Sequence, residues 1–269
     1  MLSFGKPLVM GILNLTPDSF YDGGRYSGTD AWLARAEKMI DDGASIIDLG
    51  AVSTRPGAAV VSPEEEIARL RPALKLLPGR FPGTVFSVDT FRSEVARLAA
   101  DAGAGMINDI SGGTMDKKLV NTVAETGLPY ILMHMQGIPS SMQVNPDYKD
   151  VTSEISEFFD KKLTFLHEAG IKQVILDPGF GFGKTIEHNY RLLASLGVFK
   201  KTGLPVLVGI SRKSMIYKLL NTTPDEALSA TSALHMAAVL NGADILRVHD
   251  VREAAEVIKL AGMLTTASK

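Results

Sequence analysis

The sequence predicts an α/β fold, a single (β/α)8 or TIM barrel that takes up residues 1–269. Three observations support this prediction. The 269 residues are close to the ~250 that such a barrel needs. A helical pattern, a glycine and a short apolar run ending in a polar residue recur along the chain. No linker or break in composition divides the chain, so an open, doubly wound sheet is the weaker alternative.

Eight segments are expected to supply the strands of this barrel. Each contains a continuous apolar run, which is typical of a parallel strand buried on both faces. In six of them, a glycine that can end the preceding helix comes before the run. In chain order the segments are 7–14, 41–50, 84–89, 101–109, 125–134, 168–177, 201–211 and 241–249.

Helix signals stand between these segments. Residues 62–65 and 223–226 read Ser-Pro-Glu-Glu and Thr-Pro-Asp-Glu, and each predicts a capping box with proline at the first helical position. Apolar residues at helical spacing over 33–40 follow a possible cap at Asp30 and precede Gly43. The strand and helix signals therefore alternate, as the barrel requires.

Composition excludes several classes of protein. The 28 basic and 30 acidic residues leave no basic footprint for nucleic acid. The chain has no cysteine, which rules out disulfides, thiolate zinc sites and thiol catalysis and suits the cytoplasm. Residues 1–15 lack a basic start and a cleavage site, and no apolar run approaches the ~20 residues that span a bilayer. We expect a cytoplasmic protein that binds neither nucleic acid nor membrane.

The segment 177–185, DPGFGFGKT, has the look of a phosphate-binding loop. The nucleotide-hydrolase motif would need glycine at Pro178, and the dinucleotide fingerprint would need glycine at Lys184 or Ile186. Neither motif is present, so the loop has another use. Phe180 and Phe182 stand between glycines, where burial in a core is not expected.

Polar residues at the ends of the strands predict where the active site lies. In a (β/α)8 barrel the site forms at the carboxyl ends of the strands. Any one such residue, Asp109 among them, could simply cap a helix or satisfy loop amides, and Asp48 is interpreted as structural, but eight strands ending this way indicate a site. The residues at these ends are Asn14, Asp48, Asp89, Asn108, Asp109, His134, Asp177, 211–213, Arg247 and His249.

The chemistry of this rim indicates two kinds of ligand group. Cationic donors and hydroxyls suit a phosphorylated anion, and they are Arg55, Lys213, Arg247, His249, Thr54 and Ser214. Carboxylates and an amide, at Asp89, Asn108 and Asp177, suit a flat heterocycle that presents N–H donors beside a carbonyl. Flat or soft apolar surface for stacking comes from Phe20, Met133, Phe180 and Phe182.

Together these residues resemble the motifs of one family. The motifs, in order, are MGILNLTPDSFYDGG, STRPGA, SVDT, INDISGG, LMHMQG, ILDPGFGFGKT, GISRKSM and RVHDV. They span 9–251 and are similar to those of the dihydropteroate synthases, pterin-binding (β/α)8 barrels. One departure is Ala51-Val52, where the family usually has Gly-Glu, and it bears on closure of the second loop and on the response to inhibitors.

The resemblance implies an enzyme of folate synthesis that condenses 6-hydroxymethyl-7,8-dihydropterin diphosphate with 4-aminobenzoate. It implies that the pterin is held by Asp89, Asn108, Met133, Asp177 and Lys213. The diphosphate would be bound by Asn14, Arg55, Arg247 and His249, with Mg²⁺ near Asn14 and Asp18. The aminobenzoate pocket would be formed by Phe20, Thr54, Pro56, Phe182 and Ser214. Catalysis would rest on Asp89, Asp177, Lys213 and Arg247.

The resemblance further implies a homodimer. The glycines after Asp177 are expected to let the backbone pass close to the substrates. Three alternatives stay open: a pterin-binding methyltransferase on the same barrel, a Schiff-base aldolase that uses Lys213, and a barrel that binds pterin without turning it over. The motifs S-T-R-P-G and S-R-K-S argue against the methyltransferase.

Overall fold

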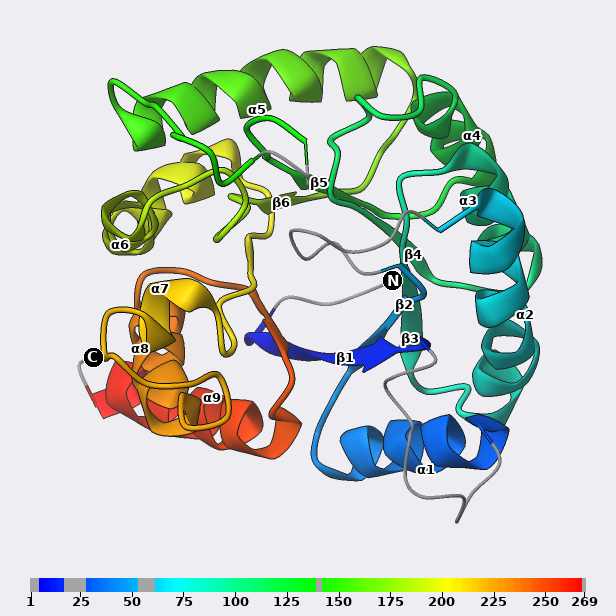
Figure 1. Ribbon diagram of the computed structural model, residues 1–269, viewed down its shortest axis with the longest axis horizontal. Helices are drawn as coiled ribbons and strands as arrows, with labels where there is room; N and C mark the ends of the chain where they lie inside the picture. The colour runs from blue at the N-terminus through cyan, green and yellow to red at the C-terminus, as the bar shows by residue number, and fades with distance from the viewer. Residues whose placement is uncertain (1–4, 17–27, 53–60, 139–141, 268–269) are drawn as a thin grey trace.

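The computed structural model describes residues 5–16, 28–52, 61–138 and 142–267. Figure 1 shows the helices as an outer ring around the strands. The strands are β1 Leu8–Asn14, β2 Ile46–Gly50, β3 Val85–Asp89, β4 Met106–Asp109, β5 Tyr130–Met133, β6 Val174–Asp177, β7 Leu207–Val208 and β8 Ile245–Val248. The helices are α1 Gly28–Asp41, α2 Pro63–Arg80, α3 Ser93–Asp101, α4 Leu119–Thr126, α5 Val151–Glu168, α6 Ile186–Ala194, α7 Ser214–Tyr217, α8 Leu228–Leu240 and α9 Val251–Ala267, with a 3-10 helix, η2, at Leu196–Thr202.

The described strands form one parallel sheet of eight in the order β6-β5-β4-β3-β2-β1-β8-β7. A parallel bridge between Leu176 and Val206 joins the two ends of this order. There the Leu176 amide donates to the Pro205 carbonyl at 2.9 Å. The sheet therefore curls into a nearly closed barrel, and the predicted fold class is confirmed.

Alternation along the strands separates the inside of the barrel from the outside. Successive residues of a strand point to opposite faces of the sheet. One apolar cluster fills the interior, and it consists of Leu8, Met10, Ile46, Met106, Ile131, Ile175, Leu207 and Ile245. Their neighbours in sequence, such as Ile47, Ile107 and Leu246, belong to a second cluster between sheet and helices. Residues two positions further along the same strands also point into the barrel, closer to the carboxyl ends of the strands.

Two of the predicted helix boundaries are confirmed. The Ser62 hydroxyl accepts a hydrogen bond from the Glu65 amide at 3.2 Å, and Pro63 is the first residue of α2. The Glu65 carboxylate pairs with Arg69 one turn later. Gly43 follows α1 with φ +109°, the left-handed conformation that ends a helix cheaply only at glycine.

Two other predicted boundaries are wrong. Helix α1 begins at Gly28, so Asp30 lies in its first turn, where its charge favours the helix dipole. Residues 223–226 form a turn, because the Glu226 carboxylate accepts hydrogen bonds from Thr222 and Thr223. Helix α8 then begins at Leu228. No helix among the described residues is long and apolar enough to cross a membrane.

Candidate active site

The parallel register brings three of the predicted site residues to one level of the barrel. Asn14 is paired with Gly50, Gly50 with Asp89, and Asp89 with Asn108. All have the inward phase of their strands. A Cβ atom at Gly50 would lie 3.4 Å from the Asn14 Oδ1 atom and 3.9 Å from the Asp89 Cβ atom. The glycine therefore leaves room for Asn14 and Asp89 to approach each other.

Arg247 stands between two carboxylates at this level. Its Nε atom donates to Asp48 Oδ2 at 2.7 Å, and its Nη2 atom donates to Asp89 Oδ2 at 2.8 Å. Asp48 is fully buried and its Oδ2 atom also accepts from Asn108 Nδ2 at 2.9 Å. Asp48, which the sequence indicated as structural, thus orients two of the predicted site residues.

Two buried oxygen atoms in this cluster have no hydrogen-bond partner among the described residues, Asp48 Oδ1 and Asn108 Oδ1. Buried polar atoms are almost always paired, by protein, water or ligand. The Asn108 amide oxygen is therefore suited to accept a hydrogen bond from a ligand bound in the barrel mouth.

Burial shifts the acidity of the two inward carboxylates. Desolvation raises the pKa of Asp89 to about 7, although the positive charge of Arg247 opposes the shift. Desolvation also raises the pKa of Asp177, against the charge of Lys213. A ligand that donates hydrogen bonds to these two carboxylates stabilises their charged forms.

Lys213 extends the cluster across the barrel from β7. Its ammonium donates to the Phe180 carbonyl and lies 4.7 Å from the centre of the Phe182 ring, a cation–π distance. Burial lowers the pKa of Lys213 to about 8, while the charge of Asp177 opposes the shift. Arg247, Asp89, Asp177 and Lys213 thus form one connected electrostatic unit.

The glycines after Asp177 lie close to other parts of the protein. Gly179, Gly181 and Gly183 all have positive φ. An added Cβ would lie 1.8 Å from the His134 carbonyl oxygen at Gly179, and 2.4 Å from the Gln136 carbonyl oxygen at Gly183. The closest neighbour of the loop is thus the segment that follows β5. At Gly181 the neighbour is the Lys213 side chain, 3.2 Å away, so glycine there gives Lys213 room.

Lys184 has a role in this loop that the sequence did not reveal. Its side chain is 3% exposed, and its Nζ atom donates to the carbonyls of Gly179 at 2.9 Å and Phe182 at 3.0 Å. It also lies 3.1 Å from His134 Nδ1. Desolvation lowers the pKa of Lys184 to about 7. The lysine holds the loop in shape, and the signal that could have shown this is a lone charge in an otherwise uncharged glycine loop.

The two phenylalanines of this loop lie in different places. Phe180 is fully buried in the cluster between sheet and helices, so the prediction that it stays out of the core is wrong. Positive φ at the glycines on either side turns the chain back on itself, which directs this ring into the layer between the sheet and the helices. Phe182 is only partly buried and borders Lys213.

Asp109 and His134 point away from the barrel interior. Asp109 accepts from the amides of Ser111 and Gly113 and from the Tyr130 hydroxyl, at 2.7, 2.6 and 2.5 Å, so it satisfies amides of the loop before α4. His134 contacts Phe158 with ring centres 4.9 Å apart. Burial lowers the pKa of His134 to about 3, so its ring is neutral. These two residues of the predicted rim support the loops around the site.

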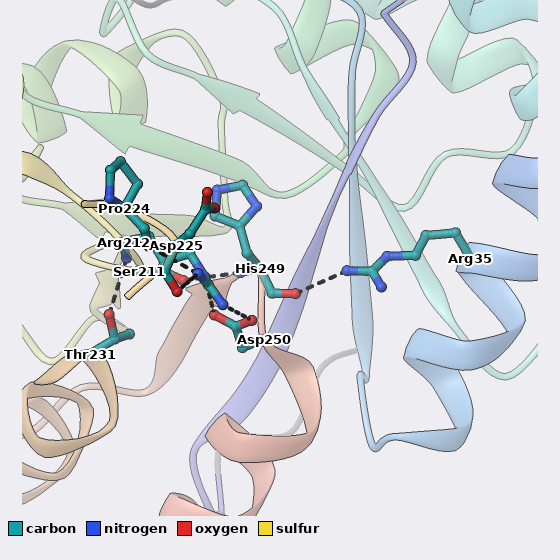
Figure 2. Close-up of polar contacts among 8 residues, drawn as sticks. All are labelled: Arg35, Ser211, Arg212, Pro224, Asp225, Thr231, His249 and Asp250. Carbon is teal, nitrogen blue, oxygen red and sulfur yellow. Dashed lines mark hydrogen bonds and ion pairs between the residues drawn. The ribbon is translucent and has the colours of Figure 1, made fainter. Parts of the chain in front are cut away.

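The ends of β7 and β8 are tied together at the rim, as Figure 2 shows. The His249 amide donates to the Ser211 hydroxyl at 3.2 Å, and Arg35 of α1 donates to the His249 carbonyl at 3.2 Å. Ser214 begins the short helix α7 directly after Lys213. His249, after β8, and Ser214, at the start of α7 after β7, therefore follow two adjacent strands at this rim.

Other predicted residues lie outside the described part of the chain. They are Asp18, Phe20, Thr54, Arg55 and Pro56. Next to the second loop, Ala51 is fully buried and its carbonyl accepts from Arg69 at 2.8 Å. Among the described residues, no group of three or more histidine or acidic side chains could hold a metal ion.

Comparisons with known proteins agree with this geometry. Residues 10–249 match the model of a family described as pterin binding enzyme. The chain is 47% identical to the dihydropteroate synthase of Escherichia coli K12 over 270 residues, which cover 100% of this chain and 95% of that protein.

Solved structures are similar over nearly the whole chain. The Yersinia pestis dihydropteroate synthase, in a sulfonamide complex, superposes with a TM-score of 0.93 at 44% identity, covering 98% of this chain and 96% of that one. The Xanthomonas albilineans enzyme in complex with 7,8-dihydropteroate gives a TM-score of 0.88 at 36% identity, with coverage of 98% and 95%.

Proposed function

Because this chain belongs to the family of pterin-binding enzymes, and among them to the dihydropteroate synthases, we propose how its residues carry out that reaction. It is a transferase of folate synthesis that condenses 6-hydroxymethyl-7,8-dihydropterin diphosphate with 4-aminobenzoate and releases diphosphate. The observation that carries the proposed site is the inward set Asp89, Asn108 and Asp177, bordered by the cations Arg247 and Lys213.

The pterin ring lies in the mouth of the barrel. The carboxylates of Asp89 and Asp177 accept hydrogen bonds from its amino and ring N–H groups, which suits two acids whose pKa values burial has raised. Asn108 contributes its unpaired amide oxygen, and Lys213 donates to the pterin carbonyl. Met133, buried and on the same inward phase, packs against the ring.

The diphosphate binds above the pterin, at the ends of β1 and β8. Arg247 and His249 neutralise its charge, together with Arg55 of the second loop. Two nitrogens of Arg247 already pair with carboxylates, so its guanidinium has a fixed position before the substrate arrives. A preorganised cation costs little reorganisation when negative charge develops on the leaving group.

A magnesium ion fits the donors at this rim. The Asn14 side-chain oxygen, beside Gly50 and Asp89, is the kind of hard donor that Mg²⁺ accepts, and Mg²⁺ commonly takes few protein ligands besides phosphate oxygens and water. Asn14 and Asp18 would hold it. When bound, the ion neutralises charge on the diphosphate. Chelation with EDTA is expected to abolish turnover and Mg²⁺ to restore it; full activity after exhaustive chelation would remove the ion from the proposal.

The aminobenzoate pocket lies beside Lys213. Phe182 offers a flat ring next to this ammonium, and Ser214 offers a hydroxyl at the start of α7. Phe20, Thr54 and Pro56 would complete the pocket from the first two loops. The Ser214 hydroxyl can donate to the carboxylate of the acid substrate, and the Phe182 ring stacks on its aromatic face.

The reaction proceeds by departure of diphosphate ahead of amine attack. The carbon–oxygen bond to diphosphate breaks, and the electron-rich pterin delocalises the cation that remains. The carboxylates of Asp89 and Asp177 stabilise this cation, and the aminobenzoate nitrogen then forms the new bond and loses a proton. No strong base is required, and the reaction is favoured when water, which would compete for the cation, is kept out of the site.

The function is tested by incubating the purified protein with both substrates and Mg²⁺. Equal amounts of diphosphate and 7,8-dihydropteroate are expected, and omission of 4-aminobenzoate should stop formation of dihydropteroate. Binding of the pterin diphosphate without release of either product would indicate a binding protein instead.

A cytoplasmic homodimer completes the proposal. Helices α8 and α9 pack together and carry Leu240, Leu260 and Met263, which are 50%, 60% and 71% exposed. Exposed apolar side chains on neighbouring helices suit a subunit interface. Light scattering after size exclusion should give about twice 28.9 kDa.

Competition between a sulfonamide and aminobenzoate would test the site as a drug target.

A further inference from the structure

We propose that Arg212 is a positioning residue, whose side chain fixes Lys213 and Ser214 relative to His249. Figure 2 shows its guanidinium between Asp250 and the segment of Pro224 and Asp225. The Nε and Nη2 atoms donate to the two oxygens of Asp250 at 2.8 and 2.9 Å. The Nη1 atom donates to the carbonyls of Pro224 and Asp225 at 2.9 and 2.8 Å.

These bonds make Arg212 unsuited to binding substrate itself. A guanidinium has five N–H donors, and four of them are committed to the protein. Its two-pronged pairing with Asp250 has the geometry that holds both partners most firmly. An arginine beside a site for two anions would otherwise be expected to bind one of them.

The backbone of Arg212 shows that the loop is held in an uncommon shape. Its φ is +53°, which is rare for a residue with a side chain and persists only where surrounding contacts impose it. The Arg212 amide donates to the Thr231 hydroxyl of α8 at 3.2 Å. Because φ is positive at 212, the chain turns sharply, and the next residue is Lys213, whose ammonium lies over Phe182.

The contacts of Arg212 link the two loops that carry site residues. Asp250 directly follows His249, and the His249 amide donates to the hydroxyl of Ser211, the residue before Arg212. The loop after β7 and the turn after β8 are therefore joined twice, once through side chains and once through the Ser211 hydroxyl. These contacts, which we call the Arg212 clamp, set the distance between the lysine beside the aminobenzoate pocket and the histidine beside the diphosphate.

The clamp also holds the turn at 223–226. The carbonyls of Pro224 and Asp225 accept hydrogen bonds from Arg212, and the Pro224 carbonyl also accepts from the Ala227 amide at 3.3 Å. This segment closes the clamp from the side of α8. The inference rests on the proposed function, since it concerns how that site is assembled.

Arg212→Ala tests the clamp, with Arg252→Ala as a matched control two residues beyond Asp250. Arg252 is an exposed arginine of α9 that pairs with Glu256 one turn away. Misplacement of reacting groups by about 1 Å can cost ~100-fold in rate. We expect kcat/KM for 4-aminobenzoate to fall by about 100-fold in Arg212→Ala and to stay normal in Arg252→Ala.

Chemical rescue separates positioning from general stability. Arg212 is 23% exposed at its side chain, so a small guanidinium ion can reach the space left by truncation. Ethylguanidinium should raise the kcat/KM of Arg212→Ala at least tenfold. Ethylurea, which is similar in shape but uncharged, should leave it unchanged. A folded variant with normal kcat/KM, or a loss that ethylguanidinium does not repair, would overturn the proposal.

A second comparison covers failure of Arg212→Ala to fold. Arg212→Lys and Asp250→Asn each weaken the same clamp, so their combined effect on kcat/KM should be smaller than the product of the single effects. Independent effects would refute the clamp.

Wild-type protein in the same assay must form dihydropteroate; if it does not, the proposed function fails. The clamp is then tested by binding of diphosphate, which Arg212→Ala should weaken about tenfold if the clamp holds and leave unchanged if it does not.

Discussion

Replacement of Lys184 by methionine should destabilise the protein strongly. Methionine fills most of the space of the lysine stem but donates no hydrogen bond. The carbonyls of Gly179 and Phe182 and the His134 nitrogen would then lose their donor in a site that is 3% exposed. The glycine loop that carries Phe182 and follows Asp177 would lose the group at its centre.

The size of the effect follows from these contacts. An unsatisfied buried acceptor costs about 1–3 kcal/mol, and three of them near the rim, where water can partly replace the donor, amount to roughly 3 kcal/mol. For a protein of this size, 1 kcal/mol corresponds to about 2–4 °C in Tm. We therefore expect Tm to fall by roughly 6–12 °C.

Thermal unfolding followed by circular dichroism measures this directly. Lys161→Met is the matched control, since Lys161 is 80% exposed and would lose only a 3.7 Å surface ion pair with Glu157. Its Tm should stay within about 2 °C of the wild type. If Lys184→Met unfolds within that same range, the hydrogen bonds of Lys184 do not hold the loop and the reasoning is wrong.

Three further outcomes are expected. Arg247→Ala should lower turnover at least ~100-fold, measured by diphosphate release, and near-normal turnover in the folded variant would contradict its role. Gly179→Ala should lose more than ~3 kcal/mol of stability in urea, while Gly127→Ala, also at positive φ but with open space around it, should lose about 1 kcal/mol; equal losses would show that the His134 carbonyl gives way. The third outcome concerns pH. The folded protein keeps a proton on Asp89 up to about pH 7 and the unfolded chain only to 3.8, so stability from this group falls as pH rises between the two. Affinity for the dihydropterin, which needs the charged carboxylate, should instead rise through pH 7, and calorimetry should find this rise absent in Asp89→Asn.

The barrel and its rim could be predicted from the sequence, for a local reason. Apolar runs, glycine stops and helix caps such as Ser62 depend on neighbours a few residues away, and the structure confirms the strands they predict. Residues at strand ends meet at one rim in any such barrel, which is why Asp89 and Asn108 lie side by side there. Similar cues failed at Asp30, which lies inside the first turn of α1, and at Thr223, whose segment forms a turn held by the Glu226 carboxylate.

Burial and partnership were decided only by the tertiary structure. The sequence does not show that Phe180 turns into the core, because that depends on how three glycines fold the chain against the loop after β5. Nor does it show that Asp48 binds Arg247, a residue 199 positions away.

The sequence by itself thus determined which elements form, their order, and which residues reach the rim, since each follows from short-range backbone preferences and the period of the strands. Only the tertiary structure decided which charges pair with which. Asp48 and Asp89 pair with Arg247. Asp250 and two backbone carbonyls bind Arg212, and other backbone carbonyls bind the buried Lys184. These pairings depend on closing the barrel, which brings distant segments together and removes the water that would otherwise satisfy them.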